Sequence, residues 1–140
     1  MTMTDVRWKL RFENLKDAFA QLEKGCEQEE YNDLELAGLV QTFNFTFELC
    51  WKTLKDLLTS EGYEVNSPRE TIRKAFEMSL IDDAEQWFNA LESRNLLSHI
   101  YNESTAKQAE AWIKGNFEPM LCKCVAILYE RADENEQKNE

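Results

Sequence analysis

Large apolar side chains recur every three or four residues along most of this 140-residue chain. One run extends from Trp8 to Cys26, and a second, wider run extends from Leu36 to Leu57. Because an α-helix completes a turn in about 3.6 residues, this spacing places the apolar side chains of each run on one side of a helix. The whole chain has only four glycines and two prolines, too few for the many tight turns of an all-β fold. The sequence therefore predicts an all-α protein.

Apolar spacing marks the first predicted helix, and capping signals mark both ends of the second. The first helix takes in the apolar run from Trp8 and is expected to span about 20 residues. Asn32 and Glu35 have the spacing of a capping box, and Gly62 is a natural stop for the helix that begins there. The apolar surface of this second helix is so wide that we expect it to be buried on two sides.

The next two helices begin at equally clear signals. Ser67 as N-cap with Pro68 in the first helical position predicts a short third helix, which the apolar spacing extends through Leu80. Asp82 with Glu85 repeats the pattern of a capping box and predicts the start of a fourth helix. The short third helix is expected to pack across one end of the others.

The fourth predicted helix reaches Tyr101, and one more helix follows it. Gly115 and Pro119 predict a kink or a break in this last helix. From about residue 132 the chain is polar, and a frayed tail is expected. Four long helices and one short helix describe an up-and-down four-helix-type bundle with an additional short helix, in a single domain spanning residues 1–140.

The cysteines and aromatic residues give no sign of a metal or cofactor site. The four cysteines include no CxxC pair, and the only close pair, Cys122 and Cys124, lies within a helical pattern. We expect reduced thiols in the core rather than disulfides or zinc ligands. Seven aromatic residues are likewise expected in the core rather than around a cofactor: Trp8, Phe43, Phe45, Phe47, Trp51, Trp87 and Phe88.

The chain shows no signal for export or for membrane insertion. It opens without a charged and then apolar leader, and no run of about 18 apolar residues is present. Together with the expected reduced thiols, this predicts a cytoplasmic protein.

A formal charge of −11 argues against sequence-independent binding of nucleic acid over the whole surface, since such binding depends on many contacts between basic side chains and phosphates. Binding of RNA would need a local basic patch. The candidate basic patch consists of Lys52, Lys55, Arg69, Arg73 and Lys74. The alternative is that these side chains belong to ordinary solvated helix faces.

The stretch from Arg94 to Tyr101 holds the only histidine of the chain, His99. Histidine is the one side chain whose unperturbed pKa lies near neutral pH, so acid–base chemistry in this protein would centre on His99. The Arg94 guanidinium is a planar fork suited to phosphate, and the hydroxyls of Ser98 and Tyr101 can position or accept a group. These groups would suffice to cleave RNA without a metal ion, through attack of a 2′-hydroxyl on its own phosphodiester. They would equally suffice to bind a nucleotide without reaction.

Helix geometry makes a site within one chain awkward. On an ideal helix His99 lies about 140° around the axis from Arg94 and about 7.5 Å along it. Either the helix end distorts near His99, or two copies of the stretch meet across a two-fold axis. A purely structural alternative also remains: Arg94 pairs with an acidic neighbour, His99 caps the helix C-terminus, and Tyr101 packs against the core.

The segment Arg-Asn-Leu-Leu-Ser-His-Ile-Tyr at positions 94–101 resembles the motif of HEPN-domain proteins, in which an arginine, a four-residue spacer and a histidine precede a tyrosine by one residue. Three further segments resemble the nucleotidyltransferase substrate-binding proteins: residues 47–55, residues 67–76 and residues 80–83. The four segments occur in order, and the similarity covers most of the chain, from about Leu10 to Leu128.

The resemblance implies a helical bundle that forms a homodimer and has a separate minimal nucleotidyltransferase as its partner. It implies either a ribonuclease toxin that is silenced when the partner transfers AMP to Tyr101, or a non-catalytic subunit that binds the nucleotide substrate of a two-chain nucleotidyltransferase. In the first case Arg94 and His99 are catalytic, and Asn95 and Ser98 shape the pocket. RNA or a nucleotide is the expected ligand, and no cofactor is expected.

Overall fold

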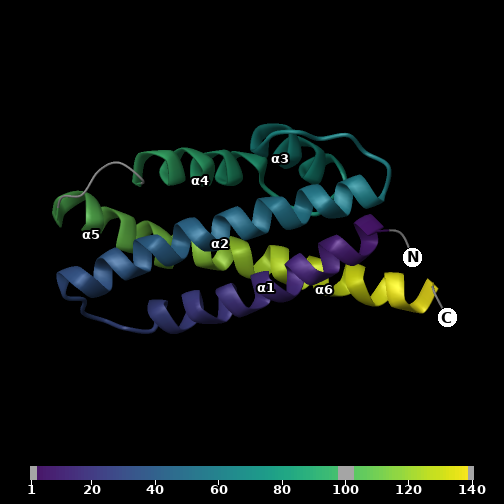
Figure 1. Cartoon of the computed structure of the whole chain (residues 1–140). Coiled ribbons are helices and arrows are strands. Elements are labelled where there is room, and N and C mark those ends of the chain that lie inside the picture. Colours follow the sequence, from purple (N-terminus) through teal and green to yellow (C-terminus); the bar gives the residue numbers. More distant parts are fainter. Residues whose placement is uncertain (1–2, 98–102, 139–140) are drawn as a thin grey trace.

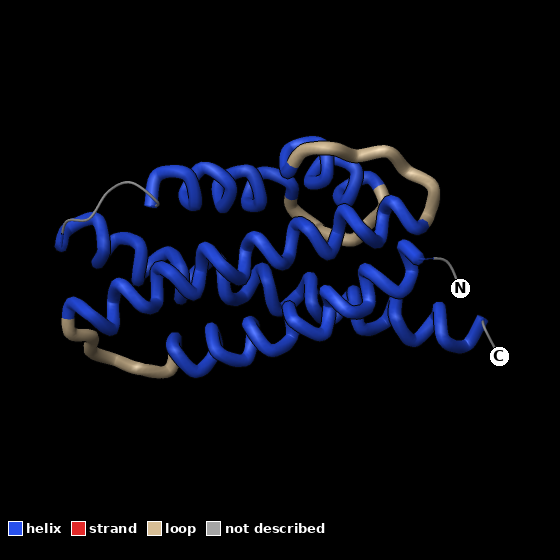
Figure 2. Tube along the Cα trace, in the orientation of Figure 1, coloured by secondary structure: helices blue, strands red, loops and turns tan. Residues whose placement is uncertain are grey.

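The computed structural model describes residues 3–97 and 103–138, and every regular element within these two ranges is a helix (Figure 2). Six α-helices and one π-helical turn follow in this order: α1 Met3–Cys26, α2 Asp33–Ser60, α3 Pro68–Glu77, α4 Ala84–Leu97, α5 Glu103–Trp112, η1 Ile113–Phe117 and α6 Glu118–Lys138. The prediction of an all-α bundle with an additional short helix is confirmed.

Helix α2 runs through the middle of the bundle. It lies antiparallel to α1 and also contacts α3, α4 and α5, while α6 packs against α1 (Figure 1). The N-terminal end of α1 and the C-terminal end of α6 lie at the same end of the bundle (Figure 1). The short α3 lies near the C-terminal part of α2 (Figure 1). Because α2 contacts helices on several sides, it brings side chains from its own surface next to α4, which carries Arg94.

The apolar runs in the sequence form the core that holds these helices together. Trp8 and Leu15 of α1 and Phe43, Phe47 and Leu54 of α2 are fully buried. The prediction that the seven aromatic residues lie in the core is wrong for one of them, because Phe45 is 60% exposed. It lies about 200° around α2 from both Phe43 and Phe47, on a side of the helix that the described residues leave uncovered.

Capping groups set the helix starts, in one case at a different residue from the one predicted. The Asn32 capping box is present: its side chain accepts from the Glu35 N–H at 2.8 Å, and the Glu35 carboxylate accepts from the Asn32 N–H at 3.0 Å. Ser67 caps α3 in the same manner, accepting from the Glu70 N–H at 3.1 Å. The N-cap of α4 is Asp83 rather than Asp82, since the Asp83 carboxylate accepts from the Gln86 N–H at 3.2 Å.

The short helix ends earlier than its apolar spacing predicts. α3 stops at Glu77, and the Leu80 N–H instead donates to the Ala75 carbonyl at 2.8 Å. Ser79 takes the left-handed conformation, with φ 60°, that this type of helix end requires. Leu80 is still fully buried, so the turn after the helix delivers the core side chain that the spacing assigned to the helix. The predicted stop after α2 is confirmed, with φ 97° at Gly62.

The predicted irregularity near Gly115 and Pro119 takes the form of a π-helical turn. It spans Ile113–Phe117, and the Glu118 N–H donates to the Ile113 carbonyl, five residues back. The wider turn joins α5 to α6 without a break in the helix, and Ile113 and Phe117 are both fully buried. α6 then continues to Lys138, beyond residue 132, where the sequence predicts the polar tail to begin.

Candidate functional site

The last turn of α4 carries the first part of the Arg94–Tyr101 stretch. Arg94 and Asn95 lie within this helix, while Ser98, His99 and Tyr101 lie outside the described residues. Leu97 is buried and anchors the helix end to the core, whereas its neighbour Leu96 is 61% exposed. The described part of the site is therefore the surroundings of Arg94.

Arg94 is held between α4 and α2 by an acidic residue that the sequence pattern did not single out. Its Nη1 donates to Glu48 Oε1 in an ion pair, and its Nη2 donates to Asn95 Oδ1 at 3.2 Å. The side chains of Arg94 and Glu48 are 22% and 36% exposed, so the pair lies at the surface rather than in the core. Arg94 thus has the acidic partner that a purely structural role for this residue predicts. A partly exposed guanidinium remains within reach of a ligand.

Glu48 is itself fixed by a second contact on its own helix. Its Oε2 accepts a hydrogen bond of 2.5 Å from Trp51 Nε1, one turn further along α2. Each carboxylate oxygen therefore has one donor, Arg94 on one side and Trp51 on the other. Hydrogen bonds to an ionised carboxylate are among the stronger ones in proteins, and two of them restrict rotation of the group.

Beneath the Arg94 guanidinium lies the aromatic core. The guanidinium carbon is 6.0 Å from the centroid of the Phe47 ring, at the outer limit for a favourable cation–π contact. The Phe47 ring in turn lies 6.3 Å from the Trp87 ring and 6.4 Å from the Phe117 ring, centroid to centroid. The Arg94 guanidinium therefore lies close to the buried aromatic core on one side, and its polar contacts with Glu48 and Asn95 lie nearer the surface.

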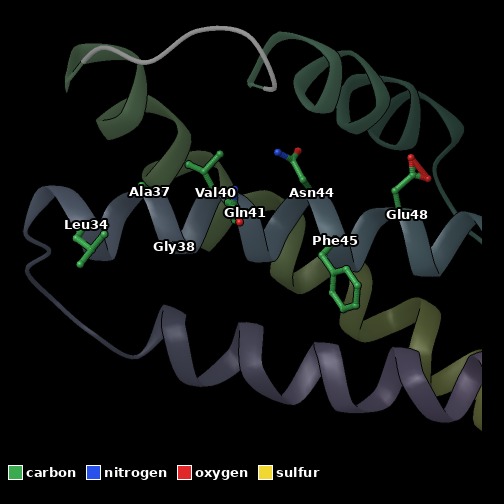
Figure 3. Close-up of a pocket in the computed structure, with 8 residues that line it drawn as sticks. All are labelled: Leu34, Ala37, Gly38, Val40, Gln41, Asn44, Phe45 and Glu48. Carbon is green, nitrogen blue, oxygen red and sulfur yellow. The ribbon is translucent and has the colours of Figure 1, made fainter.

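A groove of about 590 Å³ lies along α2 and includes Glu48 of this site (Figure 3). Its described lining comes entirely from α2: Leu34, Ala37, Gly38, Val40, Gln41, Asn44, Phe45 and Glu48. Val40, Asn44 and Glu48 point to the side where α4 and α5 lie, whereas Leu34 and Phe45 point the other way (Figure 3). Asn44 Oδ1 is buried and has no hydrogen-bond partner among the described residues. We call this feature the α2 groove.

The five residues of the basic patch lie on α2 and α3, and two of them, Arg69 and Lys74, contact other side chains. Lys74 pairs with Glu77 at 3.0 Å and lies over the Tyr63 ring, 4.7 Å from its centroid. The Arg69 guanidinium lies 5.1 Å from the centroid of the Phe88 ring of α4. Lys52 and Arg73 are exposed, and Lys55 is half-buried. The assignment of these side chains to an RNA-binding surface stays a prediction.

The remaining ionisable groups form no second site of this kind among the described residues. Burial raises the pKa of the Asp56 carboxyl, and the nearby Arg11, 3.1 Å away, opposes that shift. Cys50 and Cys124 are buried with their Sγ atoms 3.9 Å apart, and burial raises the pKa of Cys50. Cys122 is exposed, which corrects the expectation that the thiols lie in the core. Within residues 3–97 and 103–138, no three or more His, Cys, Asp or Glu side chains are placed to hold a metal ion.

Within the same ranges, no helix combines the length and the apolar character needed to cross a membrane.

Sequence comparison relates the chain to a family and to one relative from another organism. Residues 10–130 match the family described as nucleotidyltransferase substrate binding protein like. A protein of Haemophilus influenzae named "Probable ribonuclease HepT" is 29% identical over 86 residues. That match spans 58% of this chain and 59% of the length of the relative.

Two solved structures share the fold. A crystal structure from Thermus thermophilus, that of ttk003001694, is 28% identical with a TM-score of 0.71, covering 84% of this chain and 98% of that one. HI0074 from Haemophilus influenzae is 23% identical with a TM-score of 0.65, covering 90% and 98% of the two chains. It is described as having the fold of a substrate binding domain of a nucleotidyltransferase. Both similarities support the helical bundle described above.

Proposed function

The chain belongs to the family described as nucleotidyltransferase substrate binding protein like, and from this premise we propose that it is a HEPN-type, metal-independent endoribonuclease. It acts in the cytoplasm as the toxin of a two-gene toxin–antitoxin system. The observation that carries the proposal is the Arg94 guanidinium, held at the end of α4 by Glu48 and placed directly before the segment that contains His99 and Tyr101. The relative named as a ribonuclease supports the same activity.

The proposed reaction is attack of an RNA 2′-hydroxyl on the adjacent phosphorus. A bond forms between the 2′-oxygen and phosphorus, and the bond from phosphorus to the 5′-oxygen of the next nucleotide breaks. His99 removes the proton of the 2′-hydroxyl or supplies one to the leaving 5′-oxygen. Arg94 stabilises the negative charge that grows on the phosphate oxygens, while Asn95 and Ser98 shape the pocket. The basic patch guides the RNA backbone to an otherwise acidic protein.

The active unit in this proposal is a homodimer. An ideal helix would separate Arg94 and His99 within one chain, and in this proposal a second copy, rather than a distorted helix end, supplies the missing half of each site. Exposed apolar side chains on α2 and α4 support contact with a second copy: Leu34 is 82% exposed, Phe45 60% and Leu96 61%. Apolar surface of this kind is typical of sites where proteins associate.

The first test is cleavage of RNA by the purified protein and by its His99→Ala variant. We expect the wild-type chain to cleave in the presence of a metal chelator and the variant to lose at least about 100-fold in rate, because a general acid–base group contributes about 10²- to 10⁴-fold. Mixing His99→Ala with Arg94→Ala protein should restore part of the activity, since a mixed dimer can assemble one intact pair across the interface. The products are read on a sequencing gel.

Two results would count against this account. Equal cleavage by wild-type and His99→Ala protein would rule out the proposed role of the histidine. Failure of the mixed variants to regain activity, in a preparation shown to contain mixed dimers, would rule out the composite site and leave a site within one chain.

The partner in this proposal is a separate minimal nucleotidyltransferase that silences the toxin. The Tyr101 oxygen attacks the α-phosphorus of ATP, pyrophosphate leaves, and AMP remains bound to the tyrosine. Incubation with that partner and ATP should therefore add AMP units to Tyr101 and stop RNA cleavage, because a phosphodiester anion and a bulky base then fill the site. Mass spectrometry of the intact chain and its peptides measures the transfer.

A matched pair of variants makes this test specific. Tyr101→Phe should accept no AMP, whereas Tyr129→Phe, which alters an exposed tyrosine of α6, should accept as much as the wild type. AMP found at another residue, with Tyr101 unmodified, would contradict the proposed silencing.

The second candidate function is a non-catalytic subunit that binds the nucleotide substrate of a two-chain nucleotidyltransferase. The description of HI0074, which shares the fold, favours it. This function predicts a stable complex with the nucleotidyltransferase, faster transfer by that complex to a substrate other than Tyr101, and no cleavage of RNA by the chain alone.

A further inference from the structure

We propose that Glu48 is a positioning residue, which holds the Arg94 guanidinium in the orientation needed to contact the phosphate of the RNA. This inference rests on the ribonuclease function proposed above and adds to it a residue from a different helix. Glu48 lies on α2, 46 positions before Arg94 in the chain, and the fold brings the two side chains into contact.

The geometry favours a positioning role because Glu48 uses both carboxylate oxygens. Oε2 accepts from Trp51 Nε1 at 2.5 Å, and Trp51 is partly buried on the same helix. That contact fixes the plane of the carboxylate, so Oε1 presents its lone pairs to Arg94 in a defined direction. Nη1 of Arg94 is bound there, Nη2 is bound to Asn95, and the ring of Phe47 lies below the guanidinium.

Fixing Arg94 before the substrate binds has a predictable kinetic consequence. An arginine side chain has several rotatable bonds, and ordering it costs conformational entropy. If that cost is met in the folded protein, the guanidinium is already in place when charge develops on the phosphate. The negative charge of Glu48 at the same time weakens the attraction of the site for the anionic RNA backbone. The benefit therefore appears in kcat rather than in KM.

Two other roles for Glu48 make different predictions. A gate that occupies Arg94 and must move away before RNA binds would make the enzyme faster once Glu48 is replaced. A simple structural link between α2 and α4 would change stability and leave kcat of the folded protein alone. The kinetic constants of a few variants separate these roles from positioning.

The main variant is Glu48→Gln, which keeps the shape of the side chain. The two carboxylate oxygens that accept from Trp51 and Arg94 become one amide oxygen and one NH₂ group, so one of the two donors faces another donor in place of its acceptor. We expect kcat for RNA cleavage to fall by about tenfold, less than the fall expected from deleting Arg94, with KM unchanged or lower. Trp51→Phe should lower kcat in the same direction by a smaller factor, and it should have no further effect in the Glu48→Gln background, because the indole N–H acts only through Glu48.

A matched control is available elsewhere in the chain. Glu61 forms an ion pair with Arg131, and their side chains are 27% and 26% exposed. Glu61→Gln makes the same chemical change in a similar glutamate–arginine pair that joins α6 to the end of α2. It should leave kcat and KM at the wild-type values, which would show that loss of such an ion pair does not by itself slow the enzyme.

A second measurement does not depend on catalysis. The ¹⁵N resonances of arginine side chains report whether a guanidinium is held and protected from exchange. We expect a slowly exchanging Arg94 signal in the wild type and in Glu61→Gln, and its loss in Glu48→Gln. If the wild type cleaves no RNA, the proposed function fails, and this signal alone then decides whether Glu48 positions Arg94.

Three outcomes would overturn the inference. One is an unchanged kcat in Glu48→Gln when the wild type is active. Another is a rise in kcat/KM, which would identify a gate. The third is an Arg94 signal that stays equally protected without the Glu48 carboxylate.

Discussion

Replacement of Arg94 by alanine is expected to lower kcat for RNA cleavage by about 10²- to 10³-fold while the protein stays folded. In the proposed mechanism this guanidinium faces the charge that develops on the phosphate, and removal of one such electrostatic group typically costs that much. The ion pair with Glu48 is partly exposed, so its loss should lower the free energy of unfolding by only about 1 kcal/mol or less. Single-turnover cleavage, combined with urea denaturation of the same samples, measures both quantities.

Two further variants make the Arg94 prediction specific. Arg94→Lys keeps the charge but has a single ammonium group, which cannot reach Glu48 and Asn95 with two separate nitrogens, so only part of the activity should remain. Arg131→Ala removes an arginine that pairs with Glu61 at similar exposure, and it should leave kcat unchanged. A comparable loss of activity in Arg94→Ala and Arg131→Ala would show that the effect is general destabilisation or altered charge.

The fold could be predicted from the sequence because its signals are local and repeated. The apolar spacing in α1 and α2 continues over several turns, so one ambiguous position changes little. The caps at Asn32 and Ser67 involve residues only three apart, and their hydrogen bonds form as the spacing predicts. The predicted cap of α4 was wrong because Asp82 and Asp83 are adjacent carboxylates and either could serve as the cap. The turn after α3 determines which of the two caps the helix.

Exposure on α2 and the environment of Arg94 could not be predicted, because both depend on contacts between distant segments. Phe45 lies in a strongly apolar helix, and its exposure follows from which sides of α2 the other helices cover. Glu48 gave one weak signal, an acidic residue in a stretch of sequence that is mostly apolar from Phe43 to Trp51. Its partner Arg94 is 46 residues away, and no spacing rule connects two helices at that distance.

Replacement of Phe47 by alanine is expected to lower the free energy of unfolding by about 3–5 kcal/mol, the usual cost of deleting a fully buried aromatic ring. Its ring is completely buried and lies within 6.3–6.4 Å, centroid to centroid, of the rings of Phe43, Trp87 and Phe117, which come from three different helical segments. A cavity there loosens the packing of α2 against α4 and η1 at once. Chemical denaturation followed by tryptophan fluorescence measures the loss.

The same helix supplies a matched control for this prediction. Phe45→Ala removes an identical side chain that is 60% exposed, and in the monomer it should change the free energy of unfolding by no more than about 0.5 kcal/mol. A loss at Phe45 that grows with protein concentration would mean that a second copy covers the α2 groove, as the proposed homodimer requires. Equal losses at the two positions, independent of concentration, would contradict the arrangement of α2 described here, because that arrangement buries one ring and exposes the other.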